Sequence, residues 1–178
     1  MSEKFIFLVD SSAYCRLEEI KKLSGIDVLK SIKNCRAVTF LVTTEVLMEL
    51  MNGPRNVDTD FFIDNLLSTQ GSFMSGWKEN RFIIDDGKGN VSAMQLSKVS
   101  STDWNQVTLC QEHEDLNLVC NDEKMFKNAE YLIKERAFGL LRFLDKLIEL
   151  EPDVNEFTKA RDCLVSKFKR KHINSQWI

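Results

Sequence analysis

A short apolar run near the start of the chain is the feature that most restricts the fold. Phe5–Val9 contains only bulky apolar residues, and Asp10 follows it directly. A strand with one face in water alternates apolar and polar residues, whereas an unbroken apolar run is typical of a strand buried on both faces of a parallel sheet. Parallel strands are joined by long crossovers, usually helices, so this run predicts an α/β chain.

Two further apolar runs and the segments between them agree with this prediction. Residues 37–42 and 116–120 resemble the first run, and a polar residue follows each of them. The intervening segments repeat apolar residues every three or four positions, as helices do. Helices are predicted over 16–33, with a break near Ser24-Gly25, and over 45–51, 61–67, 103–114, 124–134, 138–150 and 156–168. Residues 81–84 and 91–96 flank a glycine-containing turn and predict a β-hairpin.

This order of elements predicts a Rossmann-like, three-layer α/β/α fold with a central, mainly parallel sheet and an inserted β-hairpin. The chain has 178 residues, of which 43% are hydrophobic and 29% charged. That balance suits one domain with its own core. We therefore expect a single domain over 1–178, with an insertion around 54–98.

Charge and cysteine content restrict the expected binding partners and cellular compartment of the protein. The formal net charge is −3, so nucleic-acid binding would need a local basic patch or bound metal ions. The five cysteines are odd in number and form no CxxC pair, which favours reduced thiols in the cytoplasm. The first apolar run is too short for a signal peptide, and no membrane-spanning stretch follows it, so we expect a cytoplasmic protein without a membrane partner.

Acidic residues stand at the ends of the predicted strands. Asp10 follows the first strand, Asp122 follows the third, and Glu45 and Glu49 lie on the helix that leaves the second. Asp103 opens the helix that leads into the third strand. Ligands of parallel α/β sheets bind outside the carboxyl ends of the strands, and crossover helices begin at that same edge. The sequence therefore predicts that several carboxylates gather at one edge of the sheet.

Carboxylates brought together repel one another unless a cation compensates them. Magnesium and manganese prefer oxygen ligands and retain waters. Such an ion can polarise a phosphoryl oxygen and activate a bound water, so phosphodiester hydrolysis is the expected reaction class. Ser11, Ser12 and Asn121 stand beside these acids and are expected to orient them or a phosphate.

At these residues the sequence resembles the PIN-domain family of metal-dependent ribonucleases, which includes VapC-type toxins. Phe5–Val9 with Asp10 and Ser11 resembles the family's first strand and acid, and Glu49-Leu50 resembles its helical Glu-Leu. Asp103 and the Asn-Asp at 121–122 resemble its last two acids in order and separation. The similarity of order and spacing covers nearly the whole chain.

The resemblance implies a PIN-like fold, RNA as substrate, endonucleolytic cleavage, and Mg²⁺ or Mn²⁺ as cofactor. It implies the metal-binding and catalytic residues Asp10, Glu49, Asp103 and Asp122, with Glu45 as a rival to Glu49. A toxin would also have an antitoxin partner, and a homodimer is another expectation. The chain departs from the family in the length of residues 54–98 and in bulky Trp104 after Asp103.

Other interpretations stay open at this stage. Each acid alone is more typical of a turn, a helix start or an exposed helix face. A non-catalytic PIN-like binding or scaffold module is the main alternative function. A phosphatase or receiver domain shares the first strand and acid but would need a second acid where Ser12 stands. Cys110 and His113 have metal-like spacing without the other ligands of a closed zinc site.

Overall fold

The computed structural model describes residues 4–53, 66–67, 81–85, 91–95, 101–168 and 178. In these residues a five-stranded sheet has the strand order β3-β2-β1-β6-β7, and every neighbouring pair is parallel. Strand β1 is therefore central, with β2 on one side and β6 on the other. The strands are β1 (Phe5–Val9), β2 (Val38–Thr43), β3 (Leu66–Leu67), β6 (Leu116–Val119) and β7 (Ala137–Phe138).

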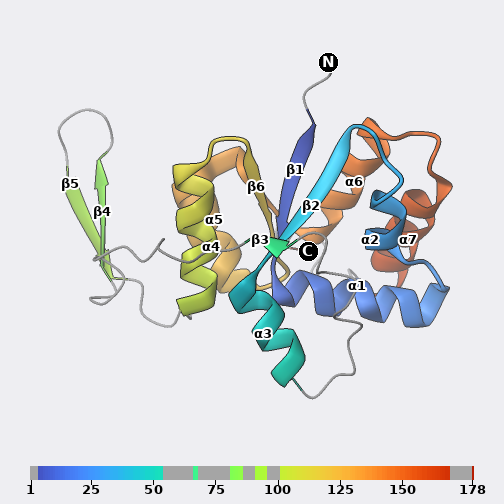
Figure 1. Ribbon diagram of the computed structural model, residues 1–178, viewed down its shortest axis with the longest axis horizontal. Helices are drawn as coiled ribbons and strands as arrows, with labels where there is room; N and C mark the ends of the chain where they lie inside the picture. The colour runs from blue at the N-terminus through green and yellow to red at the C-terminus, as the bar shows by residue number, and fades with distance from the viewer. Residues whose placement is uncertain (1–3, 54–65, 68–80, 86–90, 96–100, 169–177) are drawn as a thin grey trace.

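Helices cover both faces of this sheet (Figure 1). Helices α4 (Ser101–Glu112) and α5 (Glu123–Ile133) lie on one face, and α3 (Thr44–Asn52) continues from the end of β2. The opposite face is covered by α1 (Ser11–Ser24), α2 (Val28–Ile32), α6 (Leu140–Leu150) and α7 (Asn155–Lys167). The α/β class and the parallel central sheet are thus confirmed.

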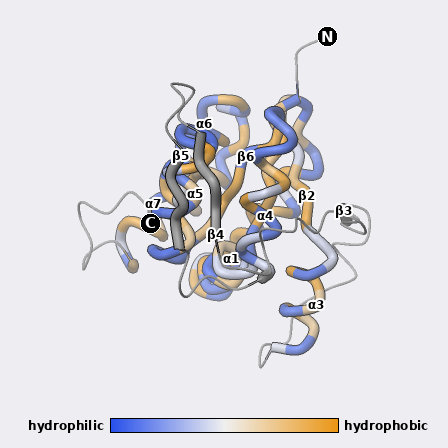
Figure 2. The backbone as a smooth tube through the Cα atoms, turned by 90° about the vertical axis from the view of Figure 1, so that its left-hand side faces the viewer, coloured by the Kyte–Doolittle hydropathy of each residue, from blue (hydrophilic) through white to orange (hydrophobic). Residues whose placement is uncertain are grey.

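Strand β1 explains why both faces need a helical cover. Phe7 and Val9 belong to the core cluster beneath α1, α6 and α7, whereas Leu8 belongs to the cluster beneath α4 and α5. Successive side chains of a strand point to opposite faces, so an unbroken apolar run supplies both cores. Figure 2 shows hydrophobic and hydrophilic stretches alternating along the helices, as expected for helices with one face on a core.

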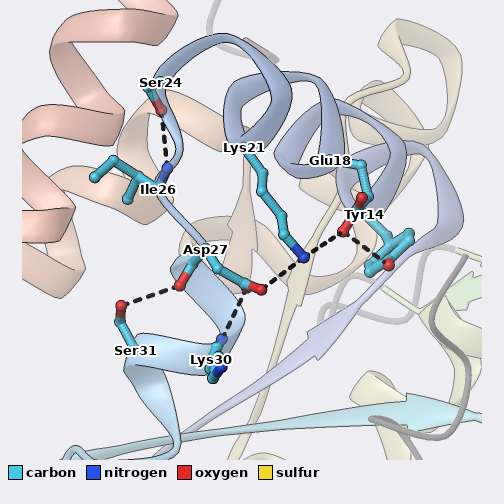
Figure 3. Close-up of polar contacts among 8 residues, drawn as sticks. All are labelled: Tyr14, Glu18, Lys21, Ser24, Ile26, Asp27, Lys30 and Ser31. Carbon is cyan, nitrogen blue, oxygen red and sulfur yellow. Dashed lines mark hydrogen bonds and ion pairs between the residues drawn. The ribbon is translucent and has the colours of Figure 1, made fainter.

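The junction of α1 and α2 shows how local sequence sets the helix ends (Figure 3). Gly25 ends α1 in the left-handed conformation, with φ at 75°. Asp27 starts α2 by accepting a hydrogen bond from the Lys30 backbone N–H at 3.1 Å. The same carboxylate pairs with Lys21 of α1 at 2.9 Å, which ties the two helices together.

The predicted strands and hairpin agree with the structure, whereas some helix bounds differ. The hairpin is present as β4 (Arg81–Asp85) and β5 (Val91–Gln95), an antiparallel pair separate from the central sheet. Helix α1 begins at Ser11 rather than near residue 16, because Asp10 caps it immediately after β1. The helix predicted over 61–67 is wrong at Leu66–Leu67, which pair with β2 as β3. The rest of that helix lies outside the described residues.

The prediction also missed β7. Residues 138–150 were expected to form one helix, but Phe138 pairs with Val119 of β6, and α6 begins only after Gly139. Among the described helices, none combines the length and apolar character needed to cross a membrane.

Candidate functional site

The carboxyl ends of the central strands form one edge of the sheet. Strands β1, β2 and β6 run parallel, so the residues that follow them emerge on the same side. Asp10 follows β1, α3 with Glu49 follows β2, and Asp122 follows β6 after a two-residue link. We call this region, with Asp103 at the start of α4, the acidic edge.

Asp10 is the most deeply buried of these acids, with 1% of its surface exposed. Its Oδ2 accepts hydrogen bonds from the Ser12 backbone N–H at 2.9 Å and from the Ser12 hydroxyl at 2.5 Å. Its Oδ1 accepts a hydrogen bond from Nε2 of Gln106 at 2.7 Å. The first of these bonds caps α1, and together they fix the carboxylate in one orientation.

Burial decides the charge behaviour of Asp10. Removal from water raises the pKa of its carboxyl above the usual value, because a low-dielectric surrounding disfavours the charged form. Hydrogen bonds from Ser12 and Gln106 act in the opposite direction and lower that pKa, but burial is the larger effect. A cation beside this carboxylate would favour its charged form.

Ser12 connects the ends of β1 and β6. Its hydroxyl donates to Asp10 and accepts a hydrogen bond from the Asn121 backbone N–H at 2.9 Å. The side chain of Ser12 therefore has the orienting position predicted for it. For Asn121 the contact with Ser12 comes from the main chain.

Ser11 brings Glu49 to the acidic edge. The Ser11 hydroxyl donates to Oε2 of Glu49 at 2.9 Å, which ties α3 to the first turn of α1. Glu49 is exposed, so its carboxylate remains accessible to a ligand. Glu45 is partly buried one turn closer to β2, and the contact with Ser11 favours Glu49 as the acid associated with Asp10.

Cys120 is a buried thiol whose pKa is affected by nearby acids of the acidic edge. Its thiol is fully buried directly after β6, and burial is the main reason why its pKa lies well above the usual value. Negative charge on Asp10 and, to a smaller extent, on Asp122 and Asp103 raises that pKa further, while a hydrogen bond with the Asp122 backbone lowers it.

The acids differ in how far they are engaged. Asp122 is exposed and caps α5, with Oδ1 accepting a hydrogen bond from the Met125 backbone N–H at 2.8 Å. Asp103 is partly exposed in the first turn of α4. The bulky residue after it, Trp104, is buried in the core between the sheet and α4–α5, away from solvent.

These side chains do not form a complete set of metal ligands. Within the described ranges, no three His, Cys, Asp or Glu side chains are placed to hold one metal ion together. The structure thus brings the predicted acids to one edge but leaves their roles as ligands a prediction. The zinc interpretation gains no support, because Cys110 is buried while His113 is exposed.

Gln106 is the site residue that the sequence reasoning missed. It lies three positions after Asp103 on α4, is fully buried, and donates directly to Asp10. Residues three apart share a helix face, but this spacing does not show how that face is turned toward Asp10, so the sequence carries no clear signal for the contact. A pattern of acids at strand ends does not include an uncharged residue inside a helix.

In three comparisons with known proteins, no family model, curated protein or solved structure matches this chain.

Proposed function

We propose that the chain is a PIN-like, metal-dependent endoribonuclease whose reaction centre is the acidic edge. The observation that carries this proposal is that Asp10 and Asp122 follow neighbouring parallel strands at one edge of the sheet, where the Ser12 hydroxyl bonds to both the Asp10 carboxylate and the Asn121 backbone N–H. Glu49 is held near Asp10 by its hydrogen bond from Ser11. Carboxylate oxygens at one edge of a parallel sheet are the kind of ligands that a hard divalent cation prefers.

The donor chemistry fits a hard divalent ion. Mg²⁺ and Mn²⁺ prefer carboxylate oxygens and usually keep several waters, so one or two protein ligands suffice. The lack of a three-ligand group within the described residues is compatible with this mode of binding. Asp10 would be the anchoring ligand, with Asp122, Asp103 and Glu49 around it. When bound, the ion would supply an activated water and charge compensation for a phosphodiester.

The chain's own residues have distinct parts in this proposal. Ser12 and Gln106 hold both oxygens of Asp10, so the carboxylate is oriented before any ligand arrives. The neighbouring sheet and helices exclude water from Asp10, which strengthens its electrostatic interactions. The exposed carboxylates of Asp122 and Glu49 lie on the solvent side, where an extended RNA backbone has access.

RNA cleavage by matched variants tests the proposal. Purified wild type should cleave a labelled single-stranded RNA in Mn²⁺ and lose that activity in a chelator. Asp10→Asn and Asp122→Asn should each reduce the cleavage rate by about 100-fold or more, at or above the 10- to 100-fold loss typical when a residue that only supports a metal ligand is removed. Asn is also a good helix cap, so the Asp122→Asn variant should keep its fold.

The matched control is Asp153→Asn, because Asp153 is exposed in the link between α6 and α7, remote from the acidic edge. This variant should cleave at the wild-type rate. Full activity in a well-folded Asp122→Asn preparation would remove the catalytic assignment.

A non-catalytic PIN-like binding module is the second candidate. The observation in its favour is that the acids form no three-ligand group within the part of the chain that the structure describes. This candidate predicts RNA or protein binding without cleavage and no change in thermal midpoint on addition of Mn²⁺.

A further inference from the structure

Gln106 has an unusual position for an uncharged polar side chain. It is completely buried on α4, where an apolar residue would normally pack. Its Nε2 donates at 2.7 Å to Oδ1 of Asp10, a residue 96 positions away in the sequence. Its main interaction is therefore with the most buried acid of the candidate site.

The carbonyl oxygen of the Gln106 amide makes no comparable contact. Oε1 of Gln106 is buried and accepts no hydrogen bond from the described residues. Burying a carbonyl without a donor is unfavourable, and an apolar side chain of similar length would avoid that cost. Packing of α4 therefore does not account for an amide here, whereas the contact with Asp10 does.

Gln106 and Ser12 bond to different oxygens of Asp10 and lie on different helices. Ser12 is two residues from Asp10 and holds Oδ2 from within the same turn of α1. Gln106 holds Oδ1 from a different helix, and that helix carries Asp103 one turn earlier. The bond from Gln106 consequently fixes the plane of the Asp10 carboxylate relative to the helix that carries a second acid.

We infer that Gln106 is a positioning residue of the acidic edge, which orients Asp10 relative to Asp103 for binding of a divalent cation. The inference rests on the proposed function and adds a residue to it. Partners that hold metal ligands in place typically change metal affinity 10- to 100-fold when they are removed. A residue that merely packs α4 would change stability without changing metal affinity in the folded protein.

Metal binding by Gln106→Met tests this inference, because methionine has a similar length and volume but no amide. Mn²⁺ affinity is measured by calorimetry and by electron paramagnetic resonance, without RNA. Gln111→Leu, an exposed position on the same helix, is the control. Folded Gln106→Met should bind Mn²⁺ about 10-fold more weakly or worse, and Gln111→Leu should bind as the wild type does.

The Mn²⁺ titrations distinguish failure of the inference from failure of the proposed function. Equal Mn²⁺ affinity in folded Gln106→Met and the wild type would overturn the inference and leave the proposed function intact. A wild type that binds no Mn²⁺ would overturn both, and the wild-type titration alone reveals this.

If Gln106→Met does not fold, Gln106→Leu, which also lacks the amide, decides instead. Folded Gln106→Leu should bind Mn²⁺ about 10-fold more weakly than the wild type. Equal affinity in the two proteins would overturn the inference.

Discussion

The burial of Asp10 conflicts with the negative charge of its carboxylate. Its burial at 1% exposure disfavours the carboxylate, while the hydrogen bonds from Ser12 and Gln106 only partly offset that cost. Under the proposed function this cost belongs to a metal-binding group, and such groups commonly reduce the stability of the free protein. The conflict can be measured by removing the charge and keeping the shape.

Asp10→Asn should therefore raise the stability of the metal-free protein at pH 7. We expect a gain of about 0.5–2 kcal/mol, because the amide has no charge to desolvate and its oxygen can still cap α1. The NH₂ of the asparagine would donate to Gln106, which turns its amide to offer Oε1. Asp122→Asn should have nearly no effect, since Asp122 is exposed and asparagine is an equally good cap. Chemical denaturation of both variants in chelator checks this, and a loss of stability in Asp10→Asn would contradict it.

The site residues show how far sequence reasoning extends at this scale. Asp10 and Asp122 could be anticipated at one edge because a residue after a parallel strand emerges at a known end of the sheet. Gln106 could not, because its contact with Asp10 depends on how α4 rotates against the sheet. That rotation is set by packing of the whole layer.

At the scale of single elements, caps determine where helices begin and end. Asp10, Thr43, Asp27 and Asp122 each accept a backbone hydrogen bond at the start of a helix. Gly25 ends α1 with φ at 75°, and its N–H donates to the Lys21 carbonyl at 2.7 Å. L-residues with a side chain rarely adopt this conformation.

Gly25→Ala isolates that conformational cost. A Cβ at this position would meet no atom within 4 Å, so backbone strain is the only expected penalty. We expect the free energy of unfolding to fall by about 1 kcal/mol, with a smaller loss for Gly25→Asn, which tolerates the left-handed region better. Urea unfolding of the three proteins measures the difference. Equal stabilities would show that α1 can end without this conformation.

Long apolar runs and capping residues made most elements predictable, whereas the shortest strands were not. Leu66–Leu67 and Ala137–Phe138 form β3 and β7 with two residues each. Two residues are too few to show a period, and neighbouring apolar residues placed Leu66–Leu67 and Phe138 in predicted helices, while Ala137 fell between two of them. Their strand conformation comes from pairing with β2 and β6, which is tertiary information.

At the scale of the whole molecule, burial of ionisable thiols couples stability to alkaline pH. Burial raises the pKa of Cys110 to about 12 from an ordinary value of 9.0, although the nearby Arg136 lowers it. The folded protein thus keeps this proton where the unfolded chain loses it. The resulting stability is fully present below pH 9.0 and is lost as pH rises toward 12.

Comparison of the wild type with Cys110→Ala tests this coupling. Between pH 9 and 12, stability of the wild type should fall more steeply than that of the variant, by about 1.4 kcal/mol per pH unit. The cavity left by alanine lowers the free energy of unfolding of the variant by the same amount at every pH, so it does not change the slope. Denaturant midpoints across this pH range give both slopes, and parallel curves would rule the coupling out.

The hydroxyl of Ser12 joins two parts of the chain 109 positions apart, from the end of the first strand to the loop after β6. On the ribosome, Asp10 emerges early, but the segment that carries Asn121 and Asp122 must be synthesised and docked before this link can close. A nascent or truncated chain therefore lacks an assembled site, so any activity of the edge begins only once most of the sheet has folded.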